Sequence, residues 1–367
     1  MTKTQFLATT EYIAKLLLSL QNGDAPAPVP DGVDLAKVYK IAAMHSLAPA
    51  VYSALEPILK EADISDDLRS AWMRERELAT VQHIRHTAAF AEMTSAFTSA
   101  GIKFLPIKGF IIKSLWSHPE LRTMADMDIV VSPEDFERAG EALISIGFTL
   151  DHGDDVHFCY MKGKFINVEL HRTLYDRAKE SFADWTPKAD NPFWYEMSYP
   201  DLVSFLLRHA YKHYERGGCG IRAIFDFYLL FERYGRPDSI PGLMTRLEGE
   251  GLAEFAVTVV TLIDKWFGTS SLVECDDVAL YVAAGGAYGT LDNSVIYSIN
   301  KRGSRLAHLL HRVFPPYRAI SSRYKWVKRC PILLPVAYLV RIFSAIFDKK
   351  TYSEIRSVKK NKKKENK

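Results

Sequence analysis

The sequence predicts an α+β protein in which a small mixed β-sheet lies between an N-terminal and a C-terminal helical region. Before about residue 100, and again after about residue 200, apolar residues recur at helical spacing. Between these regions, short runs rich in β-branched and aromatic residues are separated by turn residues, which is typical of strands. We therefore expect four parts: an N-terminal helical region (1–100), an α/β core (101–200), a helical domain packed on the core (201–290) and a basic C-terminal segment (291–367).

The N-terminal region predicts helices separated by a Pro-rich connection. One helix is expected over residues 5–22, and the Pro- and Gly-rich run at 22–32 ends it. A second helical pattern covers 34–59 and is interrupted near Pro49. A longer helix is expected over 65–100, where apolar residues form a broad face that should be buried.

Residues 101–200 change from helical to strand-like spacing. Two helices are expected among the strands, at 110–116 and 133–147, and the second has Ser132 as N-cap and Pro133 in its first turn. Residues 174–200 should be rich in loops. The expected strands of the mixed sheet cover residues 102–107, 128–131, 148–152, 156–162 and 165–172.

The region after the core predicts helices again, and then a basic end. Helices are expected over 201–215 and 221–235, with a glycine turn between them, and two more lie within 242–268. The Lys-rich run at 359–367 should be disordered, because it has no apolar surface to bury.

The composition indicates a soluble protein of a reducing compartment. Of the 367 residues, 48% are hydrophobic, which is ordinary for a packed soluble chain. The four cysteines (Cys159, Cys219, Cys275 and Cys330) lie far apart, which argues against a zinc ribbon and against a disulfide framework. The N-terminus lacks the apolar block and cleavage site of a secretory signal. We therefore expect a cytoplasmic protein.

The charge is distributed unevenly along the chain. The net charge is +3, but residues 301–367 carry +16 and the first 300 residues carry −13. Between 301 and 347 there is no acidic residue. A block of this kind indicates an anionic partner, such as a membrane surface, an anionic polymer or nucleic acid.

The most apolar stretch of the chain, 330–347, lies inside this basic block. Its two prolines and Arg341 argue against a membrane-spanning helix. We expect a helix in the plane of the cytoplasmic membrane surface, held there by its basic flanks, which would make the protein peripheral on the inner face of the membrane. An ordinary core helix with a solvated tail is the alternative, and nucleic-acid binding is the less favoured third one.

Asp126 and Asp128 are the strongest candidates for chemistry. They begin a strand-like run, and alternate residues of a strand share a face, so the two carboxylates should point the same way. Two carboxylates at this spacing repel each other, and a divalent cation would remove the repulsion. Hard cations such as Mg²⁺ prefer oxygen ligands of this kind. A bare D-x-D is common, and a strand cap plus a surface Asp is the alternative interpretation.

Glu169 and His171 are the candidates on a later strand. As a third carboxylate, Glu169 would complete a site for one or two divalent ions, which favours phosphoryl or nucleotidyl transfer. His171 should lie on the same face, where it could bind substrate or a metal-bound water. The alternatives are an exposed strand carboxylate and a partly buried structural histidine.

Lys108, Gly109 and Arg122 are the candidates for binding phosphates. Lys108 and Gly109 lie between a strand and a helix, where a glycine lets the backbone approach a phosphate and the helix N-terminus favours an anion. Arg122 lies four residues before Asp126. A solvated lysine and a turn glycine are the alternative.

His209 and His213 are four residues apart on one helical face, a spacing that can bind zinc. No H-E-x-x-H motif accompanies them. A polar network with Arg222 and Asp226, packed against the sheet, is the favoured interpretation.

These motifs occur in an order that resembles a known family. The runs are GIKFLPIKGFIIKSLW (101–116), DMDIVV (126–131), AGEALISIGF (139–148) and VELHRTL (168–174). The chain from about 35 to 235 resembles the uncharacterised nucleotidyltransferase family, within the nucleotidyltransferase superfamily that has a DNA polymerase β-type palm. The resemblance implies a mixed-sheet nucleotidyltransferase core in which Asp126, Asp128 and Glu169 bind metal. Lys-Gly replaces the Gly-Ser usual at the first turn, and Glu replaces the commoner Asp at the third acidic position.

Together, these observations predict a nucleotidyltransferase that depends on Mg²⁺ (or Mn²⁺). It would move an NMP from a nucleoside triphosphate (NTP) to a hydroxyl acceptor, which could be a small molecule, a sugar or a peptide. Lys108 and Arg122 would contact the phosphates, and Glu169 or His171 would take the proton. The alternative is an inactive module of the same fold that docks at a membrane or an anionic polymer through its basic end.

Overall fold

The computed structural model describes residues 1–154, 157–174, 182–268, 275–302 and 304–346, except 305, 306, 308, 309 and 312. The chain divides into two compact units. The first comprises Met1–Ala210 and Ile221–Leu280, and the second comprises Tyr211–Gly220 and Tyr281–Lys367. This grouping is coarser than the four-part division expected from the sequence, which stays a prediction.

The N-terminal helices form where the sequence predicts them, and polar side chains cap three of them. Thr2 and Gln5 form a capping box at the start of α1, Asp34 caps α2, and Ser65 caps the long α4. The pattern at 34–59 is divided into two helices at Leu47. The bounds are α1 Lys3–Asn22, α2 Leu35–Met44, α3 Ala48–Leu59 and α4 Asp66–Ser99.

A seven-stranded mixed sheet follows, which confirms the α+β class. Its strand order is β3-β4-β5-β2-β1-β7-β6. The pairs β2–β5 and β1–β7 are parallel, and the other neighbours are antiparallel. The strands are β1 Phe104–Pro106, β2 Met127–Val131, β3 Thr149–Gly153, β4 His157–Lys162, β5 Ile166–His171, β6 Thr186–Lys188 and β7 Asn191–Glu196.

Two expectations for this region were wrong. The segment 174–200 contains β6 and β7 as well as loops, because Phe193 and Trp194 pack on the apolar cluster and β7 pairs with β1. Helix α6 (Phe136–Ser145) begins three residues later than predicted, with Asp135 as its N-cap. The Ser132 hydroxyl accepts a bond from the Asp135 amide at 3.2 Å, so it closes the turn before the helix instead of capping it.

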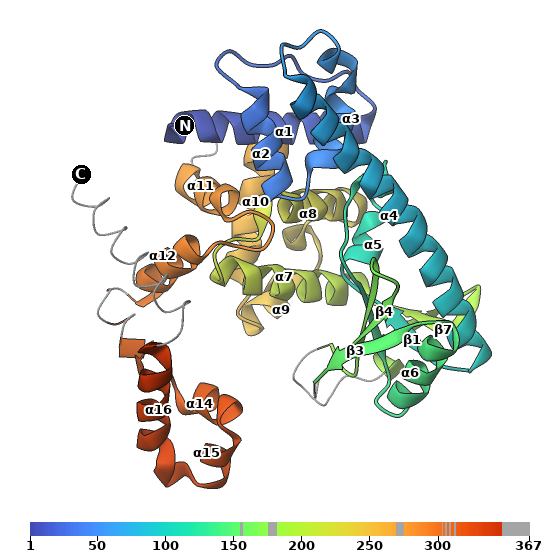
Figure 1. Cartoon of the computed structure of the whole chain (residues 1–367), viewed down its shortest axis with the longest axis vertical. Coiled ribbons are helices and arrows are strands. Elements are labelled where there is room, and N and C mark those ends of the chain that lie inside the picture. Colours follow the sequence, from blue (N-terminus) through green and yellow to red (C-terminus); the bar gives the residue numbers. More distant parts are fainter. Residues whose placement is uncertain are drawn as a thin grey trace. The chain divides into compact units, whose positions relative to one another are not determined.

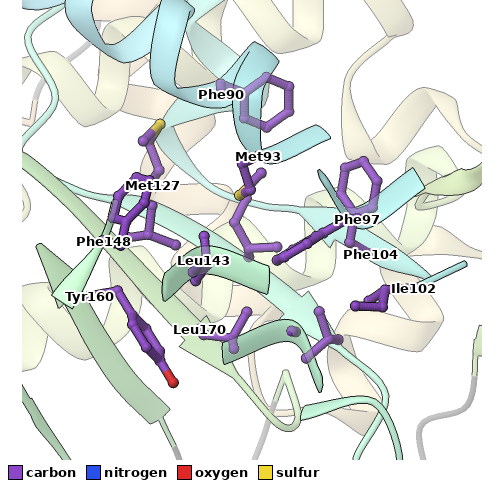
Figure 2. Close-up of a cluster of buried hydrophobic side chains, with 14 of the residues drawn as sticks. Phe90, Met93, Phe97, Ile102, Phe104, Met127, Leu143, Phe148, Tyr160 and Leu170 are labelled. Carbon is purple, nitrogen blue, oxygen red and sulfur yellow. The ribbon is translucent and has the colours of Figure 1, made fainter. Parts of the chain in front are cut away.

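The two faces of the sheet differ in character. Helices α4 and α6 cover one face and enclose an apolar cluster that includes Phe97, Phe104 and Leu143, as Figure 2 shows. The other face is packed partly by Leu105, Val130 and neighbours in a smaller cluster. Its remaining part carries polar side chains.

Helices make up the rest of the described chain (Figure 1). Among the described residues, no helix is long and apolar enough to cross a membrane. The expected disordered run at 359–367 lies outside the described residues. The further helices are α5 Gly109–Lys113, α7 Tyr199–Glu215, α8 Gly220–Tyr234, α9 Leu243–Gly249, α10 Ala253–Phe267, α11 Asp276–Gly285, α12 Leu291–Arg302, α14 Tyr317–Arg323, α15 Lys325–Arg329 and α16 Leu334–Ile346; short 3₁₀ turns are Pro119–Leu121, Phe182–Asp184, Pro237–Ser239 and Pro331–Leu333.

Candidate active site

Strand register brings the predicted acidic residues together. Strands β2 and β5 pair in parallel, and Asp128 lies opposite Glu169. Paired residues of neighbouring strands point to the same face, and their side chains are close enough to interact. Ile129 and Leu170, the next residues, point into the apolar cluster on the other face. Asp128 and Glu169 are thus held side by side by residues that are themselves locked in the core.

Asp128 is the centre of a buried polar network. Its side chain is 3% exposed, and one carboxylate oxygen accepts bonds from Lys108 Nζ at 2.5 Å and His171 Nε2 at 2.9 Å. His171 Nε2 is also 3.6 Å from a Glu169 oxygen. Although burial acts to raise it, the bonds and charges of His171 and Lys108 hold the pKa of Asp128 below its ordinary value.

The same network acts on His171 and Asp126 in opposite senses. Burial disfavours the charged imidazole, but Asp128 and Glu169 outweigh it, and the pKa of His171 is raised. Asp126 lies just before β2. Burial, with the negative charges of Asp128 and Glu169, raises the pKa of Asp126 to about 6. Burial and the neighbouring carboxylates therefore outweigh the opposing effect of Lys108 on Asp126.

This arrangement can hold a divalent cation. One ligand atom from each of Asp128, Glu169 and His171 lies within 4.8 Å of the other two. Carboxylate oxygens suit Mg²⁺ or Mn²⁺. Asp126 is not a member of that close group, but its pKa responds to two of the members. The part of Asp126 in binding the same ion stays a prediction.

The turn at Lys108 has an unusual backbone. Lys108 has φ 56° and ψ −124°, a conformation that a residue with a side chain rarely adopts. The Ile107 amide donates to the Asp128 carbonyl at 3.0 Å, which fastens the turn to β2. This backbone directs the Lys108 ammonium to Asp128. Rare backbone conformations of this kind are common at active sites and ligand-binding sites, where the surrounding structure maintains them.

Close packing, and not a positive φ angle, favours glycine at position 109. A Cβ atom there would lie 3.0 Å from Arg122 Nη1 and 3.1 Å from Met124 Sδ. The Arg122 guanidinium donates from Nη1 to the Gly109 carbonyl at 3.3 Å. A side chain at position 109 would push the turn away from the segment that leads into β2.

Arg122 has strong protein partners. Its Nε and Nη2 atoms donate to the two oxygens of Asp226 at 2.9 Å and 2.7 Å, and its side chain is 8% exposed. Trp116 Nε1 donates to the same carboxylate at 2.9 Å. The geometry supports a positioning role for Arg122 beneath the Lys108–Gly109 turn, and phosphate contact by Arg122 stays a prediction.

The polar network expected around α8 is only partly visible. Asp226 binds Arg122, and Arg222 donates to the Thr123 carbonyl at 3.1 Å. Among the residues that the structure describes, neither His209 nor His213 belongs to a group of three potential metal ligands.

The sequence interpretation missed two side chains next to the site. In the antiparallel β4–β5 pair, Cys159 lies opposite Glu169 and His157 opposite His171. The rings of His157 and His171 stack with centroids 5.4 Å apart. The available signal was the alternation in the run HFCYMK, which places His157 and Cys159 on one face.

Known proteins similar to this chain include one protein family and one solved structure. A family model described as uncharacterised nucleotidyltransferase matches residues 31–268, more than half of the chain. Among solved structures, the chain is similar to the solution structure of the antibiotic-resistance factor ANT(2'')-Ia, with 12% identity and a TM-score of 0.33. That match covers 48% of this chain and 94% of the other. A search among curated proteins gave no significant match.

Proposed function

Because the chain belongs to the uncharacterised nucleotidyltransferase family, we propose that it transfers an NMP from an NTP to a hydroxyl acceptor in a reaction that depends on Mg²⁺ or Mn²⁺. The observation that carries this proposal is the register of β2 and β5. It places Asp128 against Glu169, with Asp126 and Lys108 close by. The acceptor remains a small molecule, a sugar or a peptide.

The donor set fits the ion that this reaction needs. Asp126, Asp128 and Glu169 would supply oxygen ligands. The raised pKa of Asp126 reflects burial first and then the negative charges of Asp128 and Glu169, and a cation would offset those charges. When bound, such an ion neutralises charge on the phosphates and lowers the pKa of an acceptor hydroxyl. The repulsion between the carboxylates would then favour ion binding.

The chain's own residues take complementary roles in this proposal. Lys108 reaches Asp128 from a turn with a rare backbone conformation, and its ammonium can exchange that carboxylate for a phosphate oxygen. His171 is held between Asp128 and Glu169 with a raised pKa, so we assign it to donating hydrogen bonds that orient both carboxylates. Glu169 then remains as the group that accepts the proton of the acceptor hydroxyl.

Calorimetric titration tests the proposal without knowledge of the acceptor. Full-length protein is titrated with a non-hydrolysable NTP in the presence of Mn²⁺, and each nucleotide base is tried in turn. Binding that requires the metal is expected for the wild type and should be lost in Asp128→Asn.

The matched control is Asp151→Asn. Asp151 belongs to the same sheet, and its side chain is 60% accessible. Among the described ion pairs, its partner is the neighbouring His152. It should bind as the wild type does. Metal-dependent binding that survives in Asp128→Asn would contradict the proposal. Absence of binding by the wild type at millimolar nucleotide would favour an inactive module of the same fold.

A second proposal concerns location: the C-terminal helix binds an anionic membrane surface. In α16 and the turn before it, Ile332 is 87% exposed, Phe343 is 65% exposed and Leu339 is 55% exposed. No acidic residue occurs between 301 and 347. Exposed apolar side chains within a cationic segment fit the headgroup region of an anionic bilayer. This location would place the enzyme at the cytoplasmic face of a membrane.

Flotation of full-length protein with vesicles tests this location. Protein should float with vesicles that contain phosphatidylserine and stay behind with phosphatidylcholine alone. The double substitution Leu339→Asp and Phe343→Asp should abolish flotation, as should deletion of 301–367. Flotation that is unchanged by the double substitution would eliminate the role of α16.

A further inference from the structure

A second group of potential ligands lies beside the carboxylate site, and two of its three members, His157 and Cys159, have no role in the proposed reaction. His157 and Cys159 belong to β4, and Glu169 belongs to β5. One ligand atom from each lies within 4.8 Å of the other two. Glu169 therefore belongs both to this group and to the group with Asp128 and His171.

The strand pairing keeps these side chains together. Cys159 lies directly opposite Glu169 in the antiparallel β4–β5 pair, and His157 is two residues before Cys159 on the same face. The neighbouring residues Phe158 and Tyr160 pack on the apolar cluster of the other face. The group thus stands on rigid strands, as an ordered metal site requires.

The donor chemistry differs from that of the carboxylate site. A thiolate, an imidazole and a carboxylate together suit Zn²⁺ or another borderline transition-metal ion, whereas Mg²⁺ prefers oxygen ligands alone. Cys159 is 2% exposed, while 30% of the His157 side chain is accessible. The group is therefore dry on the thiol side and open on the imidazole side.

A further contact favours His157 as a ligand. Its Nδ1 atom is 3.3 Å from a carboxylate oxygen of Asp154, which also accepts the His157 backbone amide at 2.9 Å. Histidine ligands of metals usually donate their other ring nitrogen to a carboxylate or a carbonyl, which sets the orientation of the ring. Asp154 can hold His157 in this manner, which would leave Nε2 as the nitrogen that binds an ion.

We propose that His157, Cys159 and Glu169 form a second cation site, which binds one Zn²⁺-class ion and shares Glu169 with the nucleotidyl-transfer site. The shared ligand would fix the Glu169 carboxylate against Asp128. The site itself depends on β4 and β5 alone, so its existence does not require the proposed transfer reaction.

Cobalt spectroscopy tests the proposal directly. Full-length protein is freed of metal with a chelator and titrated with Co²⁺, whose thiolate complexes absorb strongly in the near ultraviolet. A saturable absorption at one equivalent is expected, and Zn²⁺ should displace it while excess Mg²⁺ should not. Asp128→Asn should keep the absorption although it loses NTP binding, which separates this proposal from the proposed function.

Four variants test the site. Cys159→Ser should lose the absorption, whereas Cys219→Ser, which removes another buried thiol, should keep it. Asp154→Ala should retain the absorption but weaken Co²⁺ affinity about 10- to 100-fold, as loss of a partner of a histidine ligand does. Circular dichroism checks that each variant folds. If Cys159→Ser does not fold, His157→Ala takes its place, because His157 is only half-buried and its loss should disturb the fold less. The proposal is overturned if the folded wild type gives no thiolate absorption, or if the absorption survives loss of Cys159 or of His157.

Discussion

The same strands form both faces of the central sheet, but one face is an apolar core and the other carries the candidate site. On the face covered by α4 and α6, Ile129 and Leu170 are fully buried among apolar side chains. On the other face, the adjacent Asp128 and Glu169 lie in a network with Lys108 and His171. Since neighbours along a strand point to opposite faces, the apolar face anchors the backbone that positions the polar one. Substitutions on the apolar face should therefore change mainly stability, and substitutions on the polar face should change mainly ligand binding.

The largest expected effect is on the apolar face. Phe97 is fully buried and its ring meets that of Phe104 at 5.6 Å. Phe97→Ala should reduce the free energy of unfolding by about 3–5 kcal/mol, because it removes buried area and leaves a cavity. Urea denaturation measures this, and Phe165→Ala, at a position 57% exposed, is the control. The contrast between the faces would be refuted if Phe97→Ala abolished NTP binding while leaving stability unchanged.

The next effect lies at the turn between the faces. Gly109→Ala should cost about 1–3 kcal/mol of stability, because the new methyl group meets Arg122 and Met124 and overpacking has costs of this order. It should also weaken NTP binding, since the turn carries Lys108. Thermal unfolding and calorimetry measure the two effects. Gly163→Ala is the comparison, because a Cβ there has no neighbour within 4 Å, although its φ of 62° adds strain. A normal affinity in Gly109→Ala would show that the turn does not contact the nucleotide.

A smaller effect is expected for His171. His171→Ala should lower Mn²⁺ affinity about 10- to 100-fold, because residues that orient metal ligands commonly have effects of this size. His171→Asn is the companion variant, since an amide can still donate to Asp128 and should restore part of the affinity. Isothermal titration with Mn²⁺ gives the values. An undiminished affinity in His171→Ala would remove this residue from the site.

The smallest expected effect is a pH-dependent gain in stability. The folded-state pKa of Asp126, about 6, is above its ordinary value of 3.8, so the stability of the metal-free protein falls as the pH rises from the ordinary value to about 6. Asp126→Asn should therefore raise the melting temperature at pH 8 in chelator and have little effect at pH 4. Wild-type Mn²⁺ affinity should rise over the same range, as the carboxylate ionises. A destabilised Asp126→Asn protein at pH 8 would contradict this sign.

Much of the local structure follows from the sequence. Asp34 and Ser65 cap helices that begin where the sequence predicts them, and the apolar run at 129–131 predicts β2. These features depend on residues within a few positions of each other, where backbone sterics and side-chain spacing decide the outcome.

Other features were set by contacts between distant segments. The pairing of β7 with β1 made a strand from a segment that resembles a loop, and Asp226 gave the buried Arg122 a partner 104 residues away. Neither contact can be predicted from the spacing of residues along the sequence.

The sequence by itself determined most helices up to residue 268, most of the strands and the shared face of Glu169 and His171, because side-chain spacing along a helix or strand is set locally. Only the tertiary structure decided that Asp128 meets Glu169 and that Glu169 meets Cys159. Strand order and register depend on how the whole apolar face packs beneath α4 and α6, and a shift of one residue would turn every one of these groups to the other side.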